Sequence, residues 1–361
     1  MANDYYLRQI MPGYQPILCT SQHIYLFRRG WLYRTSHSLE VPVRIARIPD
    51  DRQLISFAPR IFERVFRTAV QSAALCGSNE MLLARRNNIW RIDLKSGAVE
   101  LDYSVPDGRS LLTLSKITSS KTRAEWLVFG EYFHNPDRGE VRLWRRKCEK
   151  NEQWKVGATF PVGEINHVHA IQQLSDGRVY VLAGDFEDAA SVWETDADLN
   201  ELRPIMRGEQ RFRACWWFER DSSVVYGTDS NLEVNELLTL QPNNKTLRKL
   251  AELPGSCIYH GRTGANLVFS TTVEPGHTTG NFVRDALSRT AGPGITGDPA
   301  IFLYSDSLVK LFDSPKDFWP PRLGQFGTFM FPAGVAPENR FYAYGVAVKK
   351  YDGTCLVFDK L

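Results

Sequence analysis

Alternating apolar and polar positions recur along this chain in short runs, several of which end at a glycine followed by a polar residue. The clearest run spans 166–185: an apolar stretch, a tight turn at Asp176-Gly177, and a second apolar stretch that ends at Gly184-Asp185. A period of two residues, rich in Val, Ile and Tyr and interrupted by Asp-Gly, is typical of a β-hairpin. The run therefore predicts two antiparallel strands.

Related endings occur at similar intervals along the chain. The markers Gly130, Gly184, Gly227 and Ser270 are separated by 54, 43 and 43 residues, and an alternating strand follows each. A period in the forties with four short strands per unit is typical of β-propeller blades. At about 50 residues per blade, 361 residues predict roughly seven four-stranded blades. We therefore expect an all-β protein, a single β-propeller domain over 1–361 with a long loop insertion at about 274–299.

The chain ends are expected to meet in this fold. The run 354–358 is expected to be the final strand of the last blade and could pair with N-terminal strands to close the ring, which would leave no exposed sheet edge. The best helical candidate, 59–74, is short and contains β-branched residues, so we interpret it as a local insertion.

Composition narrows the classes of partner. The 44 basic and 41 acidic residues give a net charge of +3, which provides no basis for nucleic-acid binding. No stretch approaches the ~18 apolar residues of a membrane span, so we expect no membrane partner. The N-terminus shows no secretory signal, and the six cysteines are scattered without a C-x-x-C pair. We therefore expect a cytoplasmic protein with reduced, buried cysteines; the sequence does not indicate an oligomeric state.

Candidate site residues gather at two kinds of position: the starts of inner strands and the corners that follow the apolar runs. Inner strands are expected at 212–217 and 256–260, among others. In a propeller the inner strands line one channel, so these side chains should converge. Histidine transfers protons near neutral pH, arginine binds carboxylates in a bidentate manner, and carboxylates orient or accept protons. The catalytic candidates are His167, His169, Arg213, Tyr259 and His260. The substrate-binding candidates are Glu131, His134, Arg138, Asp185, Gln210, Arg211, Asp229 and Glu274.

Structural interpretations of the same residues stay open. His167 and His169 could bond the backbone of neighbouring blades, and the corner aspartates Asp185 and Asp229 could bond loop amides. Arg213 is harder to explain in this way, because a charge on an inner strand needs a partner. We expect no cofactor; the alternative is a divalent metal on a cluster of His167, His169 and His260.

Two blade-end segments and one tripeptide carry a family resemblance. The segments 148–154 and 195–200 occupy the places of the Asp-box Ser-x-Asp-x-Gly-x-x-Trp in degenerate form, and Arg47-Ile48-Pro49 echoes the Arg-Ile-Pro signature. With these features the chain resembles the sialidase-like, BNR-type β-propellers of carbohydrate-active proteins. The resemblance implies an enzyme that cleaves an acidic polysaccharide or oligosaccharide.

Two reaction types are compatible with that resemblance. A polysaccharide lyase would use the three histidines with Arg213 and Tyr259 to neutralise a uronate and remove its C5 proton. A glycoside hydrolase would use two carboxylates drawn from Glu131, Asp185, Asp229 and Glu274. The alternative function is a non-catalytic propeller that binds a glycan or a protein partner.

Overall fold

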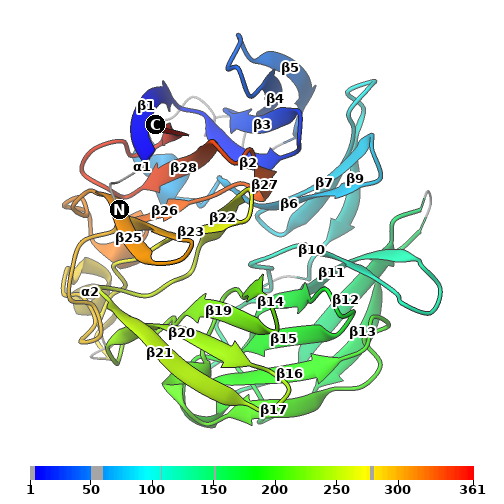
Figure 1. The fold of residues 1–361 in the computed structure, drawn as a ribbon, viewed down its shortest axis with the longest axis vertical. Helices are drawn as coiled ribbons and strands as arrows, with labels where there is room; N and C mark the ends of the chain where they lie inside the picture. The colour runs from blue at the N-terminus through cyan, green and yellow to red at the C-terminus, as the bar shows by residue number, and fades with distance from the viewer. Residues whose placement is uncertain (1–4, 50–59, 107, 150–151, 277–279) are drawn as a thin grey trace. The chain divides into compact units, whose positions relative to one another are not determined.

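The computed structural model describes residues 5–49, 60–106, 108–149, 152–276 and 280–361, and they consist mainly of short antiparallel strands (Figure 1). The chain forms two compact units. The first contains residues 1–70, 230–235 and 252–361, and the second contains residues 71–229 and 236–251. The expectation of one domain over 1–361 stays a prediction.

The second unit carries four sheets, each of four strands that follow one another along the chain. This is the blade pattern that the repeat predicted. The sheets are β6 (Val70–Cys76), β7 (Glu80–Arg85), β8 (Asn88–Asp93) and β9 (Val99–Ser104); β10 (Ser115–Thr118), β11 (Glu125–Gly130), β12 (Val141–Lys147) and β13 (Lys155–Phe160); β14 (Val168–Gln173), β15 (Val179–Ala183), β16 (Ser191–Thr195) and β17 (Arg203–Arg207); and β18 (Phe218–Arg220), β19 (Ser223–Gly227), β20 (Asn235–Gln241) and β21 (Thr246–Leu253).

The first unit carries one four-stranded sheet and one nine-stranded sheet. In the smaller sheet β1 pairs antiparallel with β29, Tyr5 opposite Lys360, which confirms the predicted pairing of the two chain ends. The smaller sheet runs β1 (Tyr5–Pro12), β29 (Thr354–Lys360), β28 (Arg340–Val346), β26 (Thr328–Met330). The larger runs β25 (Leu308–Asp313), β24 (Ala300–Tyr304), β23 (Asn266–Ser270), β22 (His260–Thr263), β27 (Ala333–Ala336), β2 (Gln15–Cys19), β3 (His23–Arg28), β4 (Trp31–Ser36), β5 (Val43–Arg47).

The described strands form five separate four-stranded blades, so the prediction of seven such blades is wrong. The strand β27 is the reason. It pairs in parallel with β2, Leu18 opposite Ala333, and with β22, Arg262 opposite Val335. Two runs of four strands are thereby joined into the nine-stranded sheet. No local sequence pattern indicates that segments so far apart in the chain will pair in parallel.

Central strands are buried on both faces, which explains their unbroken apolar runs. All five residues of β15 are buried between β14 and β16. Val181 and Ala183 join Val128, Ile171 and Trp193 in one apolar cluster of the second unit. Full burial of a Val or Leu side chain stabilises the fold by about 1.5–3 kcal/mol. Outer strands such as β17 are largely exposed.

Two inner-strand expectations require correction. Residues 212–217 do not form a strand: η3 (Gln210–Phe212) is a 3₁₀ turn, Ala214 makes one bridge to Thr228, and β18 begins only at Phe218. Likewise β22 begins at His260, after a single bridge from Ser256 to Thr272. Buried side chains can point inward from these irregular segments as they do from strands, so the apolar pattern alone does not distinguish the two.

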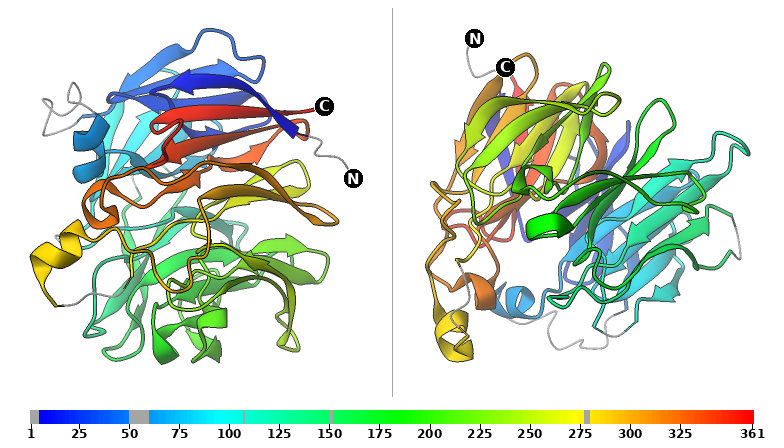
Figure 2. Two further views of the ribbon diagram at one scale, coloured as in Figure 1. Left: turned by 90° about the vertical axis from the view of Figure 1, so that its left-hand side faces the viewer. Right: turned by 90° about the horizontal axis from the view of Figure 1, so that it is seen from below.

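Three short helices belong to the first unit: α1 (Arg60–Val65), α2 (Phe282–Leu287) and α3 (Pro321–Gly324). They lie along one side of that unit (Figure 2). The helix α1 falls within the expected local insertion, whose first residue lies outside the described residues, and α2 lies within the expected loop insertion. Among the described residues, no helix has the length and apolar character to cross a bilayer.

One cysteine expectation is wrong. Cys76 at the end of β6 and Cys148 just after β12 form a disulfide, with Cα atoms 5.1 Å apart and a sequence separation of 72. The two positions become neighbours only through the packing of two different sheets, so their sequence spacing gave no signal. The other four cysteines are free and buried, as expected: Cys19, Cys215, Cys257 and Cys355.

Candidate functional site

Two sheets of the second unit bring candidate residues together where their first strands begin (β14, β15 and β19 are labelled in Figure 1). His167 immediately precedes β14 and His169 lies on it, so the two side chains project from the same face. Asp185 follows β15, Arg213 follows the η3 turn, and Asp229 follows β19. The predicted equivalence of strand starts and corners therefore places five of the predicted residues in one cluster.

The Gly184 corner fixes the position of Asp185. The Gly184 amide donates to the His167 carbonyl at 2.9 Å, so the corner is tied to the start of β14. Gly184 has φ of 85°, and a Cβ atom there would overlap the Ala189 carbonyl. Only glycine fits both constraints. The sequence signal Gly-Asp thus reports a backbone turn that aims the aspartate at the histidines.

The two imidazoles and Asp185 converge atom to atom. The His167 Nε2 atom lies 3.0 Å from His169 Nε2. Asp185 Oδ1 lies 3.2 Å from His167 Nε2 and 3.4 Å from His169 Nε2. Three potential electron-pair donors thus lie within 3.4 Å of one another.

The other ring nitrogens fix the tautomers. His167 Nδ1 lies 3.1 Å from the Phe133 carbonyl oxygen, and His169 Nδ1 lies 3.0 Å from the Ala214 carbonyl oxygen. A carbonyl oxygen can only accept, so both Nδ1 atoms carry hydrogen and donate. In the neutral imidazoles both Nε2 atoms therefore present lone pairs to each other and to Asp185. This arrangement is stable only with a positive charge between them, either a proton or a metal ion.

Arg213 joins the two carboxylates. Its Nη2 atom lies 3.2 Å from Asp185 Oδ1 and 3.3 Å from Asp229 Oδ2. Asp229 Oδ2 also accepts from the Cys215 thiol at 3.3 Å, and the Gln210 amide donates to the Asp185 carbonyl oxygen at 2.8 Å. The sequence-based expectation that Arg213 needs a charged partner is confirmed. Gln210, predicted to bind substrate, instead supports the backbone of the Asp185 corner.

The cluster is buried and acidic. His167, His169, Arg213 and Asp229 are all buried, and 19% of the Asp185 side chain is exposed. Burial is the largest single effect on the pKa of Asp185 and raises it, but the Arg213 charge together with the contacts to His167 and His169 outweighs burial and holds that pKa well below its usual range. Within the described contacts, two carboxylates thus face one guanidinium. One negative charge is left for a further cation to balance.

The distances fit a metal coordination sphere. Zinc binds imidazole nitrogen and carboxylate oxygen at ~2.0–2.2 Å, so two ligand atoms on one ion lie roughly 2.9 Å apart at a right angle and roughly 3.4 Å apart at the tetrahedral angle. The three distances among His167, His169 and Asp185 span this range. Both histidines also donate a hydrogen bond from Nδ1–H to a backbone carbonyl, as metal-bound histidines commonly do with their second ring nitrogen. A second group, His169 with Cys215 and Asp229, also has its potential ligand atoms within 4.8 Å.

Other predicted residues of the second unit lie outside this cluster. Glu131 is buried and is occupied by Arg109, by the Trp144 indole at 3.1 Å and by the Arg142 amide at 3.0 Å. Arg138 pairs with Asp188 at 2.5 Å and Arg211 with Glu236 at 3.0 Å. His134 is exposed on its loop. Glu131 is therefore a structural corner, the interpretation that had been left open for the aspartates.

Three predicted residues belong to the first unit. His260 begins β22, and burial, followed by the nearby charge of Arg262, lowers the pKa of its imidazole to about 4. Tyr259 directly precedes that strand. Glu274 accepts from the Ser256 hydroxyl at 2.6 Å.

Two contributions to the cluster were not predicted. Cys215 was interpreted as a small apolar residue, but its thiol donates to Asp229. The Tyr132 ring lies 4.2 Å from the His167 ring and covers one side of it. Tyr132 directly follows Glu131 in the repeat, so its corner position was the only sequence signal.

Comparison with known proteins supports the fold alone. No family model and no curated protein matches the sequence. Among solved structures, the extracellular domain of the putative one-component system BT4673 from B. thetaiotaomicron is 9% identical with a TM-score of 0.52, covering 96% of this chain and 40% of that chain. A chain of the mitotic checkpoint complex is 10% identical with a TM-score of 0.52, covering 100% and 96%. The AfRom2 CNH domain is 6% identical with a TM-score of 0.54, covering 98% of each chain.

This chain therefore spans about 40% of the matched B. thetaiotaomicron chain. Identities of 6–10% carry information about fold and none about activity. The resemblance to sialidase-like propellers is confirmed only at the level of the fold. The chain is an all-β protein with a β-propeller fold.

Proposed function

We propose that this protein binds a divalent transition-metal ion through His167, His169 and Asp185. The observation that carries the proposal is the approach of the two Nε2 atoms to 3.0 Å while both Nδ1 atoms donate to carbonyls. Neutral imidazoles in this arrangement repel each other, and a shared cation removes the repulsion. A single proton shared by the two rings is the competing explanation.

The ligand types define the class of metal. Two imidazole nitrogens and one carboxylate oxygen suit zinc, iron, copper or nickel better than magnesium or calcium, which prefer oxygen ligands. Three protein ligands leave coordination positions for water or for a ligand of the ion. Arg213, in contact with Asp185, would favour an anionic ligand at such a position.

Cleavage of an acidic glycan is the second candidate function, as expected of a sialidase-like propeller. It is favoured by the convergence of His167, His169 and Arg213. The histidines would supply a base, and the Arg213 guanidinium would bind the carboxylate of the substrate. Elimination fits better than hydrolysis, because Asp185 and Asp229 both contact the Arg213 guanidinium and are not free to act as acid and nucleophile. The burial of the histidines favours a small acidic ligand over a long polysaccharide.

Titration of metal-depleted protein with Zn²⁺ in a calorimeter tests the metal proposal. We expect one ion to bind per chain, and His169→Ala to weaken that binding by roughly 100-fold or more. The matched control is His134→Ala, which removes an exposed histidine outside the cluster and should leave the affinity unchanged.

Equal affinities of wild type and His169→Ala would exclude this site and leave the shared proton as the explanation. The glycan candidate is tested separately by incubating the protein with acidic oligosaccharides and recording the ultraviolet absorbance of unsaturated uronates. Absorbance that the wild type produces and His167→Ala does not would support elimination. Absorbance that is equal in both would exclude His167 from that reaction.

A further inference from the structure

Exposed apolar side chains gather on the short helices of the first unit. On α1 and just after it, Phe62 and Val65 are each 46% exposed and Phe66 is 38% exposed. Before and on α3, Phe318 is 63% exposed, with Trp319 and Leu323 close to 40%. On α2, Val283 and Leu287 are 63% and 58% exposed. We call these eight residues the helix surface.

The three helices that carry the helix surface lie next to one another. The helix α3 contacts both α1 and α2, and both views in Figure 2 show the three helices on the same side of the first unit. Neighbouring rings also pair within it: Phe62 and Phe66 stack at 6.4 Å, and the Phe318 and Trp319 rings lie 4.9 Å apart. Single exposed apolar residues need no explanation, but a contiguous group of this kind marks an interaction surface.

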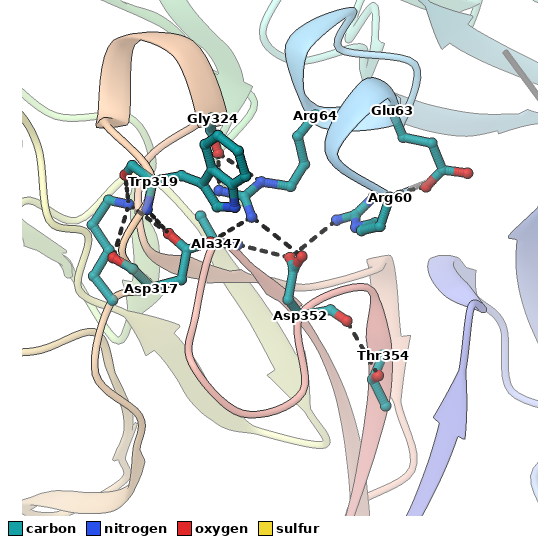
Figure 3. Close-up of polar contacts among 10 residues, drawn as sticks. Arg60, Glu63, Arg64, Asp317, Trp319, Gly324, Ala347, Asp352 and Thr354 are labelled. Carbon is teal, nitrogen blue, oxygen red and sulfur yellow. Dashed lines mark hydrogen bonds and ion pairs between the residues drawn. The ribbon is translucent and has the colours of Figure 1, made fainter. Parts of the chain in front are cut away.

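A buried network of ion pairs and hydrogen bonds links α1 to α3 (Figure 3). Arg64 of α1 is buried, and its Nε atom donates to the Gly324 carbonyl of α3 at 2.6 Å. Its Nη1 atom contacts Asp317 at 2.5 Å and Asp352 at 3.3 Å. Arg60, one turn earlier, also reaches Asp352, at 3.4 Å. This network holds α1 against α3, and the apolar side chains of the helix surface take no part in it and are exposed.

The rim of the helix surface is positively charged. Arg67, Arg284 and Arg289 are exposed, and the structure shows no ion pair for any of them within the described residues. The nearby carboxylates are already engaged: Glu63 with Arg60 at 3.0 Å, and Asp317 with Arg64 and with Lys316 at 2.8 Å. The surface thus combines protruding aromatic and aliphatic side chains with uncompensated arginines.

We propose that the helix surface docks on an anionic lipid bilayer. Exposed Phe, Trp and Leu side chains enter the boundary between headgroups and acyl chains, and neighbouring arginines bind anionic headgroups. A bilayer accepts side chains projecting from three separate short helices without a complementary groove, which a protein partner would have to supply. The sequence-based expectation of no membrane partner depended on the absence of a span, and peripheral docking needs none.

Sedimentation with lipid vesicles tests the proposal, using the complete chain. We expect the wild type to bind vesicles containing about one third phosphatidylserine far more strongly than vesicles of phosphatidylcholine alone. Each arginine near an anionic surface strengthens binding about fivefold, so Arg284→Glu with Arg289→Glu should weaken it by roughly 25-fold or more. Phe318→Ser with Leu323→Ser should also reduce binding, because both side chains are exposed and available for insertion.

Two control variants distinguish binding through the helix surface from non-specific binding of the protein to vesicles. Lys121→Glu changes an exposed charge of the second unit, and Val162→Ser removes a 73% exposed apolar residue there. Both should bind like the wild type. The proposal would be overturned if the wild type did not bind anionic vesicles. It would also be overturned if the helix-surface variants bound these vesicles as strongly as the wild type. Self-association that the helix-surface variants abolish, without vesicle binding, would assign the surface to a second copy of this chain and overturn it as well.

Discussion

Each unit of this protein contains a buried arginine between two aspartates, but the two arrangements differ in what surrounds them. In the first unit Arg64 contacts Asp317 and Asp352, and Arg60 and Lys316 supply further positive charge (Figure 3). In the second unit Arg213 contacts Asp185 and Asp229, and the remaining neighbours of Asp185 are two imidazoles.

The difference separates a structural network from a candidate site. Around Arg64 donors face acceptors: its guanidinium also binds the Gly324 carbonyl, and Asp352 accepts from the Ala347 amide at 2.8 Å. Around Arg213 acceptors face acceptors, with His167 Nε2, His169 Nε2 and Asp185 Oδ1 within 3.4 Å of one another. In the Arg64 network the charges balance and the donors have acceptors, so no further group is needed. In the Arg213 cluster the converging lone pairs repel one another unless a cation lies between them.

The largest expected effect is on the complete network. Arg64→Ala leaves Asp317 and Asp352 without their shared partner and should reduce the free energy of unfolding by roughly 3–4 kcal/mol, a loss typical of breaking a buried ion pair. Urea unfolding measures it. Because no metal site is involved, added Zn²⁺ should not restore the loss, and restoration would contradict the comparison.

The equivalent change in the second unit should behave differently. Arg213→Met removes the positive charge between Asp185 and Asp229 and should cost roughly 3 kcal/mol in metal-depleted protein. Here Zn²⁺ supplies the missing charge, and at 100 times its dissociation constant a bound ion stabilises the folded state by about 2.7 kcal/mol. Unfolding with and without Zn²⁺ checks this. If Zn²⁺ failed to stabilise the variant, the metal would not belong at Asp185.

A third effect concerns His260 and pH. Its folded pKa, about 4, lies below the ordinary value of 6.5, so between these values the unfolded chain binds the extra proton. The stabilisation is therefore complete above pH 6.5 and is lost as the pH falls toward 4, by on the order of 3 kcal/mol. His260→Gln should flatten the decline in this window, measured as unfolding free energy against pH. An unchanged decline would exclude His260 as its source.

The smallest effect is expected at an exposed pair. Arg8 contacts Asp359 at 2.5 Å, but the Arg8 side chain is 52% exposed and Asp359 is also held by Arg340. Arg8→Ala should therefore change the unfolding free energy by less than about 1 kcal/mol. A loss as large as that of Arg64→Ala would show that burial does not govern these networks.

The sequence predicted those features that depend on the local pattern of residues. The Gly184-Asp185 corner and the spacing of His167 and His169 predicted that these three side chains converge, because both signals arise from the backbone of one hairpin. The pairing of β1 with β29 followed from the expectation that the last strand closes the ring of blades.

What sequence could not predict depends on contacts between distant segments. Neither the pairing of β27 with β2 and β22 nor the disulfide between Cys76 and Cys148 has a local signature. The role of Cys215 depends on where the Asp229 carboxylate lies. The corner residues show the limit most clearly: Glu131 and Asp185 occupy equivalent places, yet Glu131 is occupied by Arg109, Arg142 and Trp144, and only Asp185 faces histidines.

The most direct test of the central claim is the visible absorption spectrum of the protein titrated with Co²⁺, which reports nitrogen and oxygen ligands of a bound ion. We expect absorption that saturates at one ion per chain in the wild type and in His134→Ala, and that is lost in both His167→Ala and His169→Ala. A spectrum that persists in the two cluster variants, or that is absent from the wild type, would contradict the assignment of His167, His169 and Asp185 as a metal site.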